Sequence, residues 1–194
     1  MVLRVAKTEL IGLGEDMTER FKMLGAVPEP VEVMWHSPTV AATALAVGDK
    51  VGAWNAADDS LKSFAHMAVA AQVGCGWCLD AGYFQAQNEN LDMAKASQVP
   101  RWRESDVFSP LERDVMEYAE AMTNTPPTVT DALSGRLLEQ VGPAAMVELT
   151  AFIAYANFAT RNNTALGIES QGFSAACDIP LAARPGSVGA GTTT

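Results

Sequence analysis

The sequence predicts an all-α fold, and three observations support that prediction. Apolar residues recur at helical spacing along most of the chain, capping and helix-ending residues bound these stretches, and the alternation typical of strands is hardly visible. The 194 residues are enough for one well-buried domain. We therefore expect a single helical domain over residues 1–179 and a disordered, flexible tail over 180–194, where Pro, Gly, Ser and Thr are frequent.

Three short helices are expected in the first third of the chain, over residues 16–24, 31–36 and 39–47. The second and third are separate because Ser37 precedes a proline, and a residue in that position is pushed out of the α region of backbone conformations. His36 lies at this junction, where we interpret it as a structural, hydrogen-bonding residue.

The middle of the chain predicts two longer helices in direct succession. The first starts at the N-cap candidates of residues 58–60, carries an alanine-rich apolar stripe that allows other helices to approach closely, and ends at Gly74. The second runs from about residue 76 to 87, and a further short helix is expected over 91–96.

The second half of the chain predicts three helices. Residues 110–122 follow the N-cap Ser109, begin with a proline and contain the capping-box glutamate Glu112. A second helix is expected over 130–141 and a third over 144–164, separated by a Gly-Pro pair. The third is the longest apolar stretch of the chain, which predicts a central or oligomer-facing helix.

Charge and composition exclude several function classes. The formal net charge of −10, from 13 basic and 23 acidic residues, repels phosphate backbones and anionic membranes. Trp102 lies between Arg101 and Arg103 in a predicted loop, where we interpret it as a surface anchor or an oligomer contact, because two charges do not make a nucleic-acid surface. No apolar run is long enough to span a bilayer. We expect neither nucleic acid nor a membrane as a partner.

The N-terminus and the cysteine count predict the compartment. Arg4 and Lys7 fall in what would have to be the apolar part of a signal peptide. Three cysteines, an odd number in a chain without a recognisable secretion signal, predict thiols that are reduced at rest. We therefore expect a cytoplasmic protein in which any disulfide is transient.

The residues best suited to chemistry are Cys75 and Cys78, in a Gly-Cys-Gly-Trp-Cys segment between the two middle helices. A cysteine in the first turn of a helix faces unpaired backbone N–H groups and the positive end of the helix dipole, and both lower the pKa of the thiol. The spacing puts the two sulfurs on one face, where they can close a disulfide within one turn. One cysteine can then attack an oxidant and the other can resolve the product.

A Cys-x-x-Cys pair has other interpretations. Zinc needs four ligands, and besides the pair the chain offers only Cys177, His36 and His66, so we expect neither a metal nor another cofactor. A thioredoxin-like site needs strands that alternate with helices, and this neighbourhood is helical on both sides. The residues leave two alternatives open, a redox pair on a helical scaffold or two inert buried cysteines.

Four segments of the chain resemble the carboxymuconolactone decarboxylase / AhpD-like alkylhydroperoxidase family, over roughly residues 17–170. The resemblance implies an all-α, AhpD-like helical bundle that assembles as a homo-oligomer, with its active site near the cysteine helix. It also implies a small hydroperoxide as substrate and a thiol or disulfide as electron donor. The segments are His-Ser-Pro at 36–38, the cysteine core at 74–78, Phe-Ser-Pro-Leu-Glu-Arg at 108–113 and Asn-Phe-Ala-Thr-Arg-Asn-Asn at 157–163.

The peroxidase branch of that family has a Glu-x11-Cys-x2-Cys-x3-His motif, in which the glutamate and the histidine form a proton relay. Ser63 takes the place of the glutamate here and Gly82 that of the histidine, and neither acts as a base at neutral pH. The resemblance carries over Cys78 as the peroxide-attacking sulfur and Cys75 as its resolving partner. We predict that His66, one turn after Ser63, is the substitute base.

Other polar residues near the motif are open to more than one interpretation. Asp80 and Glu89 are alternative bases, although a nearby carboxylate works against forming a thiolate. Arg161 lies in a very apolar helix, so we expect it to have a carboxylate or backbone partner. A role in binding a substrate anion stays open for it, because the decarboxylase branch handles carboxylated lactones. Trp77 either shields the disulfide, lines a pocket or packs in the core.

Three hypotheses about function follow. The first is a thiol-dependent hydroperoxide reductase that uses the cysteine pair. The second is a family member without peroxidase activity that acts as a binding or structural oligomer, and the replacements at Ser63 and Gly82 motivate it. The third is a carboxymuconolactone decarboxylase-like lyase, in which the cysteines would be dispensable. The resemblance favours the first.

Overall fold

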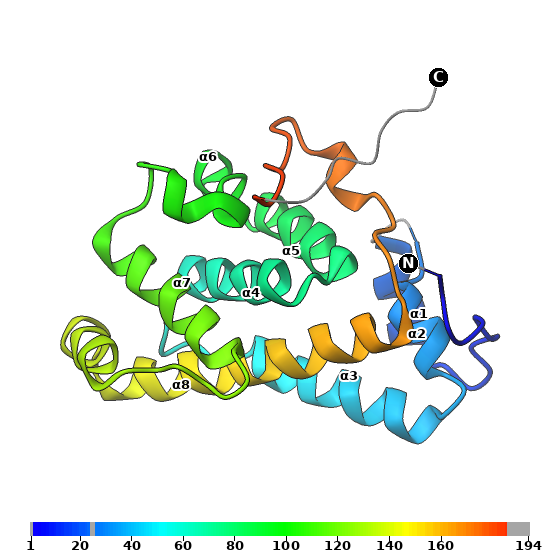
Figure 1. Cartoon of the computed structure of the whole chain (residues 1–194). Coiled ribbons are helices and arrows are strands. Elements are labelled where there is room, and N and C mark those ends of the chain that lie inside the picture. Colours follow the sequence, from blue (N-terminus) through cyan, green and yellow to red (C-terminus); the bar gives the residue numbers. More distant parts are fainter. Residues whose placement is uncertain (1, 24–25, 186–194) are drawn as a thin grey trace.

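The computed structural model describes residues 2–23 and 26–185. Within these residues there is no β-strand, and helices form the whole architecture, which confirms the all-α prediction (Figure 1). The elements in chain order are α1 (Glu15–Met23), α2 (Glu29–Met34), α3 (Pro38–Gly52), α4 (Asp59–Val73), α5 (Gly76–Asn88), α6 (Met93–Ala96), the 3₁₀ helix η1 (Val99–Glu104), α7 (Pro110–Thr123), α8 (Asp131–Leu166) and the 3₁₀ helix η2 (Phe173–Ala176).

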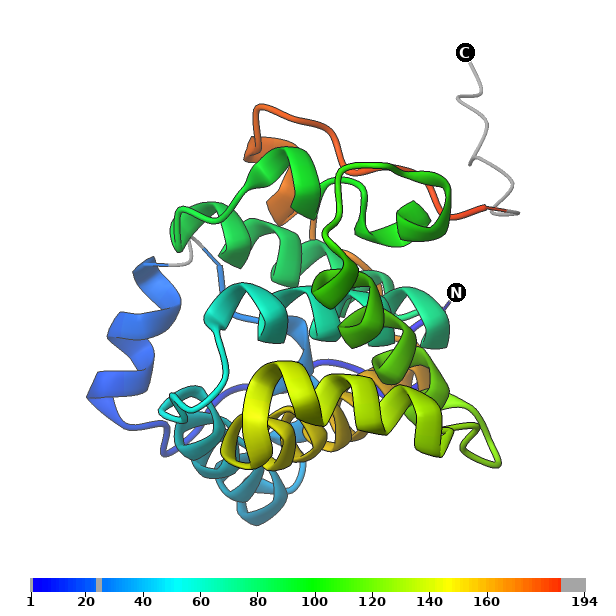
Figure 2. The ribbon, with the colours of Figure 1, turned by 90° about the vertical axis from the view of Figure 1, so that its left-hand side faces the viewer.

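Helix α4 lies at the centre of the molecule and contacts α5, α7 and α8 (Figure 2). It begins after Asp58, whose side chain accepts a hydrogen bond from the Ser60 amide at 2.8 Å, as the capping pattern predicted. It ends at Gly74, which has a φ of 82° that glycine adopts without steric cost. Three of its alanines, at positions 65, 68 and 70, are fully buried, and their small side chains let the neighbouring helices come close.

Helix α8 packs against α4 and α7 along the lower edge of the molecule in Figure 1. Two helices were predicted here, and the structure joins them into one element with a break at Gly142, where φ is 76° and ψ is 168°. Pro143 follows and cannot donate a backbone hydrogen bond to the preceding turn. The two predicted segments are therefore the two halves of one kinked helix.

By length and composition alone, α8 could cross a membrane. It is nevertheless interrupted at Gly142, it carries Glu148 and Arg161, and it packs along α4 and α7. A water-soluble protein fits these observations.

Helix α7 starts with the predicted capping box. The Ser109 hydroxyl accepts a hydrogen bond from the Glu112 amide at 3.3 Å, and the Ser109 amide donates to the Glu112 carboxylate at 2.6 Å. The reciprocal bonds satisfy two backbone N–H groups that a helix start otherwise leaves unpaired.

Helices α1 to α3 enclose a second, smaller apolar cluster. Helix α3 continues past Gly48, where the sequence predicted its end. The glycine serves a close approach instead, because a Cβ at this position would lie 2.6 Å from the hydroxyl oxygen of Tyr155. The buried residues of the cluster are Phe21, Val31, Trp35 and Ala41.

Trp102 is buried, with only 6% of its surface exposed, and it belongs to the main core. The prediction of a surface anchor was therefore wrong. Its indole N–H donates to the Glu120 carboxylate at 2.9 Å, and the Arg103 guanidinium lies over its ring at 4.1 Å from the centroid. The Arg103 guanidinium thus covers the tryptophan from outside instead of exposing it.

The chain after α8 returns across α5. The flexible tail was predicted to begin at Pro180, and its residues 186–194 lie outside the described part of the chain. The described residues before them lie along the helical body: Leu181 packs against the main core, and the Ala182 amide donates to the Ser97 carbonyl at 2.9 Å.

Candidate functional site

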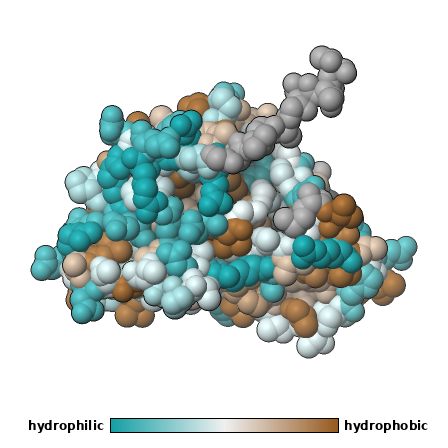
Figure 3. All heavy atoms as spheres, in the orientation of Figure 1, coloured by the Kyte–Doolittle hydropathy of each residue, from teal (hydrophilic) through white to brown (hydrophobic). Residues whose placement is uncertain are grey.

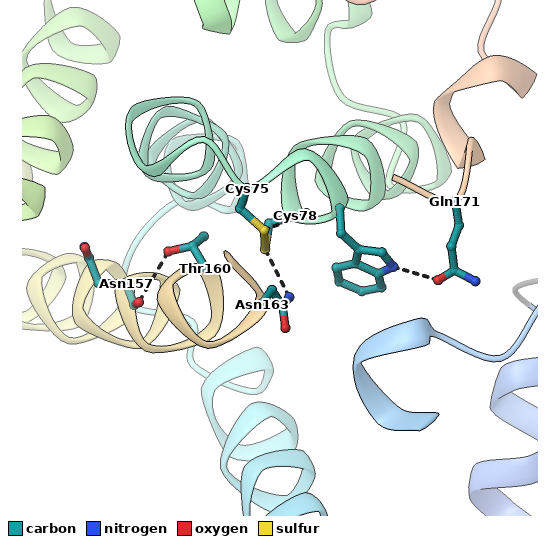
Figure 4. The surroundings of a disulfide bond; sticks show 7 residues. Cys75, Cys78, Asn157, Thr160, Asn163 and Gln171 are labelled. Carbon is teal, nitrogen blue, oxygen red and sulfur yellow. Dashed lines mark hydrogen bonds between the residues drawn. A yellow bond between two sulfur atoms is a disulfide. The ribbon is translucent and has the colours of Figure 1, made fainter. Parts of the chain in front are cut away.

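Cys75 and Cys78 form a disulfide at the junction of α4 and α5, with their Cα atoms 5.3 Å apart (Figure 4). The turn at Gly74 ends α4, and Cys75 is the N-cap of α5. Its sulfur accepts a hydrogen bond from the Cys78 amide at 3.2 Å, so the pair lies at the unpaired N–H groups of a helix start. The predicted spacing and helix position of the two sulfurs are confirmed.

Both cysteines are buried, each with 1% of its surface exposed. They pack against Ala70 of α4, while Trp77 and Leu79 cover them on the α5 side. A small oxidant can reach such a pair only through the layer of side chains around it, so the neighbouring residues control access as well as reactivity.

Asn163 of α8 makes a polar side-chain contact with the pair. Its amide nitrogen lies 3.3 Å from the Cys78 sulfur and donates a hydrogen bond to it, and Asn163 itself is 4% exposed (Figure 4). Sequence reasoning assigned Asn163 no role, although it lies in one of the segments that carry the resemblance. The sequence signal was an asparagine within an apolar helix, because such a residue needs a polar partner when it is buried.

Other residues of the 157–163 segment connect α8 to α7. The Asn157 amide nitrogen donates to the Thr123 hydroxyl at 3.0 Å, and Thr160 is completely buried next to it. Arg161 donates from Nη2 to the Thr123 carbonyl at 2.6 Å and from Nε to the Asn157 side-chain oxygen at 3.3 Å. The guanidinium thus has the backbone partner that the sequence predicted. These contacts fix the position of Asn163 beside the sulfur.

His66, Ser63 and Gly82 line one small polar pocket of about 100 Å³ between α4 and α5. The His66 ring lies directly against Gly82, where a side chain on residue 82 would collide with it. None of the hydrogen bonds found in the described residues joins His66 to a cysteine. The residue that the ring contacts, Gly82, lies one helical turn after Cys78 on α5.

Burial keeps His66 neutral in this pocket, and the Lys62 and Asp59 charges around it are paired with one another. Burial lowers the pKa of His66 from 6.5 to about 4, so its imidazole is neutral at pH 7. The Lys62 ammonium is neutralised by Asp59 at 2.8 Å and by Glu148 at 3.4 Å. Glu89, one of the alternative bases, lines the pocket and accepts a hydrogen bond from Gln85 at 2.7 Å.

Asp80, the other alternative base, holds the segment after α8. Its carboxylate accepts hydrogen bonds from the Ser170 hydroxyl at 2.7 Å and from the amides of three successive residues, 172–174, at 2.7 to 3.0 Å. Burial opposes the ionisation of Asp80, but these hydrogen bonds outweigh it, and its pKa lies below the ordinary value of 3.8. Its lone pairs are used for anchoring, so it is not placed to act as a base.

Trp77 is held by Gln171, which lies in the segment that follows α8. Its indole N–H donates to the Gln171 side-chain oxygen at 2.7 Å, and that oxygen also accepts from the Glu29 amide at 2.8 Å. Gln171 in turn donates to the Val27 carbonyl at 3.0 Å. One side chain thus connects the residue between the two cysteines to the start of α2.

The remaining zinc candidates lie in other contacts. His36 places Nε2 2.9 Å from the Ala6 carbonyl oxygen, which fits the structural role predicted for it. Cys177 is a free, half-buried thiol whose pKa is raised, chiefly by burial. Among the described residues, no three His, Cys, Asp or Glu side chains gather in a way that could hold a metal ion.

Sequence comparison adds one family model and one relative. Residues 38–121 match the model of the carboxymuconolactone decarboxylase family. The chain is 37% identical over 123 residues to the uncharacterized protein YnjA of Escherichia coli K12. That alignment spans 63% of this chain and 66% of YnjA, just under two thirds of the relative's length.

Solved structures share the fold. A complex of the debrominase Bmp8, a cysteine-to-alanine variant, with 2,3,4-tribromopyrrole has a TM-score of 0.72 at 18% identity, covering 89% of this chain and 96% of that one. An uncharacterized peroxidase-related protein with an alkylhydroperoxidase AhpD core, from Ralstonia eutropha JMP134, has a TM-score of 0.73 at 20% identity, covering 88% and 93%.

A putative antioxidant defence protein AhpD from Agrobacterium tumefaciens has a TM-score of 0.66 at 18% identity, with 71% of this chain and 94% of that one covered. At these identities the likeness concerns the fold. The family model places residues 38–121 of this chain in the carboxymuconolactone decarboxylase family, and the solved structures share its AhpD-like fold.

Proposed function

We propose that this protein is a thiol-dependent hydroperoxide reductase. The Cys78 thiolate attacks the outer peroxide oxygen, breaks the O–O bond, releases the alcohol once its oxygen is protonated, and becomes a sulfenic acid. The Cys75 thiol then attacks the Cys78 sulfur, forms the S–S bond and releases water. A small thiol or a dithiol donor returns two electrons by disulfide exchange. The net reaction converts one hydroperoxide and two external thiols into an alcohol, water and one external disulfide.

The observation that carries this proposal is the hydrogen bond that the Asn163 amide donates to the Cys78 sulfur. Both residues are buried, and the sulfur belongs to a disulfide at the start of α5. A donor aimed at a sulfur favours its thiolate form, and the helix N-terminus adds to the same effect. An unaided thiol is only a few per cent thiolate at pH 7. The Asn163 amide therefore supplies part of the activation that the replaced family relay would supply, and it favours Cys78 as the attacking sulfur.

His66 is the base in this proposal. Its ring fills the space beside Gly82 on α5, where the family relay carries a histidine, so this chain delivers an imidazole to the same place from α4. Because the ring is neutral at pH 7, it can take the Cys78 proton through a water molecule and return it to the leaving alcohol. The polar pocket around Ser63 and His66 provides room for a water beside the ring.

Assembly as a homo-oligomer is part of the proposal. The lower edge of the molecule in Figure 3, formed by α3 and α8, shows hydrophobic side chains at the surface. The large hydrophobic residues of these two helices that are at least 45% exposed are Val40 and Val47 of α3 and Leu138, Val147 and Phe158 of α8. An apolar face shared by two helices is typical of a subunit contact. A cytoplasmic location fits thiols that must be reduced in every cycle.

The other hypotheses have less support. A binding or structural oligomer is favoured by the absence of relay residues at Ser63 and Gly82, but it leaves the Asn163 contact and the placement of His66 without a purpose. A decarboxylase-like lyase would need a cation for its substrate carboxylate. Arg161 already donates to the Thr123 carbonyl and to Asn157, which favours a structural role for it.

The experiment that tests the proposal is trapping of the sulfenic acid. The Cys75→Ser variant, treated with one equivalent of an organic hydroperoxide, should accumulate a sulfenic acid on Cys78 that dimedone captures and mass spectrometry detects. The Cys78→Ser variant is the matched control and should give no adduct at Cys75. Adducts at neither cysteine, or equally at both, would contradict the assigned roles.

A further inference from the structure

We propose that an apolar cavity beside the disulfide binds an uncharged organic molecule about the size of one substituted ring. The cavity measures about 190 Å³ and lies where α2, α3, α5 and α8 meet. Its walls include Val31 and Met34 of α2, Leu45 of α3, Trp77 of α5 and Phe158 of α8. Residues of α5 and α8, far along the chain from α2 and α3, thus line one cavity with them.

The lining selects for apolar, neutral molecules. None of the described residues that line the cavity carries a charge, and the polar side chains among them are Asn162, Asn163, Trp77 and Tyr155. The Tyr155 ring stacks on Phe158 with ring centroids 6.2 Å apart, and burial is the main cause that raises the pKa of Tyr155, so it stays neutral at pH 7. A carboxylate in this cavity would lose its hydration without gaining a cationic partner.

The cavity reaches the reactive pair through two residues. Asn163 lines the cavity and donates its hydrogen bond to the Cys78 sulfur, and Trp77 lines it from the position between the two cysteines. The Trp77 ring is fixed by its bond to Gln171. A molecule in the cavity is therefore separated from the Cys78 sulfur by a single side chain, the amide of Asn163.

The size of the cavity sets the size of the occupant. An apolar cavity of about 150 Å³ is enough to bind benzene in an engineered protein. The space here is larger by roughly the volume of a substituent of one or two heavy atoms, which matches a ring that carries a short side chain. The occupant that we propose is therefore a small molecule of this size.

For the proposed peroxide chemistry, on which this part of the inference rests, the cavity predicts a preference. The ring of an aryl hydroperoxide such as cumene hydroperoxide would lie among the apolar residues, and its peroxide group would point past Asn163 toward Cys78. Hydrogen peroxide gains nothing from the cavity, because it has no apolar surface to bury. Neutral ring-bearing hydroperoxides should therefore react faster than hydrogen peroxide.

The direct test uses a probe that has no redox chemistry, 2-phenyl-2-propanol, the alcohol that cumene hydroperoxide would yield. Ala44 of α3 lines the cavity, so Ala44→Phe fills it, whereas Ala46→Phe on the same helix adds the same ring at an exposed position. We expect calorimetry or protein NMR on the oxidised protein to show binding to the wild type and to Ala46→Phe, and at least about tenfold weaker binding to Ala44→Phe. Benzoate, a ring of similar size with a charge, should bind more weakly than the alcohol to the wild type.

No binding of the alcohol to the wild type, or equal affinity in wild type and Ala44→Phe, overturns the cavity assignment. The kinetic comparison separates this result from the peroxidase proposal. Ala44→Phe should lower the rate of thiol oxidation by cumene hydroperoxide about tenfold more than it lowers the rate with hydrogen peroxide. If the alcohol binds as expected but neither peroxide oxidises the thiols faster than a free cysteine, the cavity stands and the peroxidase proposal fails.

Discussion

The imidazole of His66 lies against Gly82 so closely that a Cβ on residue 82 would be 2.8 Å from Nδ1 and 3.0 Å from Cε1 of the ring. One helix supplies the histidine and the facing helix supplies the space for it. The two positions therefore depend on each other, and substitutions at either should be read together.

The dependence predicts the outcome of moving the histidine between the helices. His66→Ala should slow the oxidation of Cys78 by peroxide at pH 7 by roughly a hundredfold, because it removes the proton acceptor. Gly82→His alone should destabilise the fold, since its side chain would enter the His66 ring. The double variant His66→Ala/Gly82→His returns an imidazole to the same space and should recover most of the rate.

Stopped-flow measurement of thiol oxidation between pH 5 and 9 checks this prediction, with thermal unfolding as the control for stability. A purely structural histidine would change the melting temperature but not the shape of the pH profile. A rate in His66→Ala equal to that of the wild type would remove His66 from the mechanism.

Substitution of Asn163 should raise the pKa of the Cys78 thiol. Asn163→Ala deletes the N–H donor beside the sulfur and should slow oxidation at pH 7 by about tenfold. Asn163→Asp keeps the shape but places a carboxylate there, which disfavours the thiolate further, so the pKa should rise more than in Asn163→Ala. The pH dependence of alkylation by iodoacetamide in Cys75→Ser backgrounds measures this pKa. An unchanged pKa in both variants would show that the hydrogen bond does not act on the reduced enzyme.

Loss of the Asp80 carboxylate should release the segment that follows α8. Asp80→Asn leaves the amides of residues 172–174 with a weaker acceptor and should lower the free energy of unfolding by about 2 kcal/mol, the usual contribution of hydrogen bonds to a buried charged group. Urea unfolding measures this change. Asp178→Asn, at an exposed position in the same segment, is the matched control and should change stability little.

Acid titration tests the same interaction from the other side. Because the pKa of Asp80 is lower in the folded than in the unfolded state, its contribution to stability is present above the ordinary carboxyl pKa of 3.8 and is lost as the pH falls through the folded value. Asp80→Asn should remove this part of the acid sensitivity. Equal acid sensitivity of wild type and variant below pH 4 would contradict the assignment.

His66 should make stability depend on pH in a higher window. Its folded pKa of about 4 lies below the ordinary value of 6.5, so the unfolded chain binds a proton between these values while the folded protein does not. Stability should be highest above pH 6.5 and decline as the pH falls from 6.5 toward 4. His66→Gln should flatten the curve in this window. Thermal unfolding at half-unit pH steps would show the difference, and identical slopes would mean that the histidine is solvated in the folded state.

Sequence reasoning located the features that depend on neighbours along the chain. The capping box at Ser109 and Glu112, the end of α4 at Gly74 and the N-terminal position of the cysteine pair all follow from residues within one helical turn. Such local chemistry has the same meaning in most folds. For this reason most helices were predicted where they lie. The exceptions are α3, which continues past Gly48 to its contact with Tyr155, and α8, which joins two predicted helices.

Contacts between distant residues were predicted less well. Asn163 is 85 residues from Cys78 in sequence, so its role becomes visible only when α8 is packed on α5. Trp102 was misjudged because its flanking arginines indicate an exposed position, whereas Glu120 of α7 closes over it. The contact between His66 and Gly82 was predicted in part. The sequence showed that Gly82 takes the place of the family histidine, but only the structure shows that the His66 ring lies against this glycine.

The rate at which the reduced protein forms the Cys75–Cys78 disulfide with an organic hydroperoxide at pH 7 is the most direct test of the account. Cys78→Ser is the control for nonspecific oxidation. We predict a rate at least about a hundredfold above that of free cysteine, which falls to the background in Cys78→Ser. A wild-type rate no faster than that of a free thiol would contradict the peroxidase proposal and favour a binding or structural role for the protein.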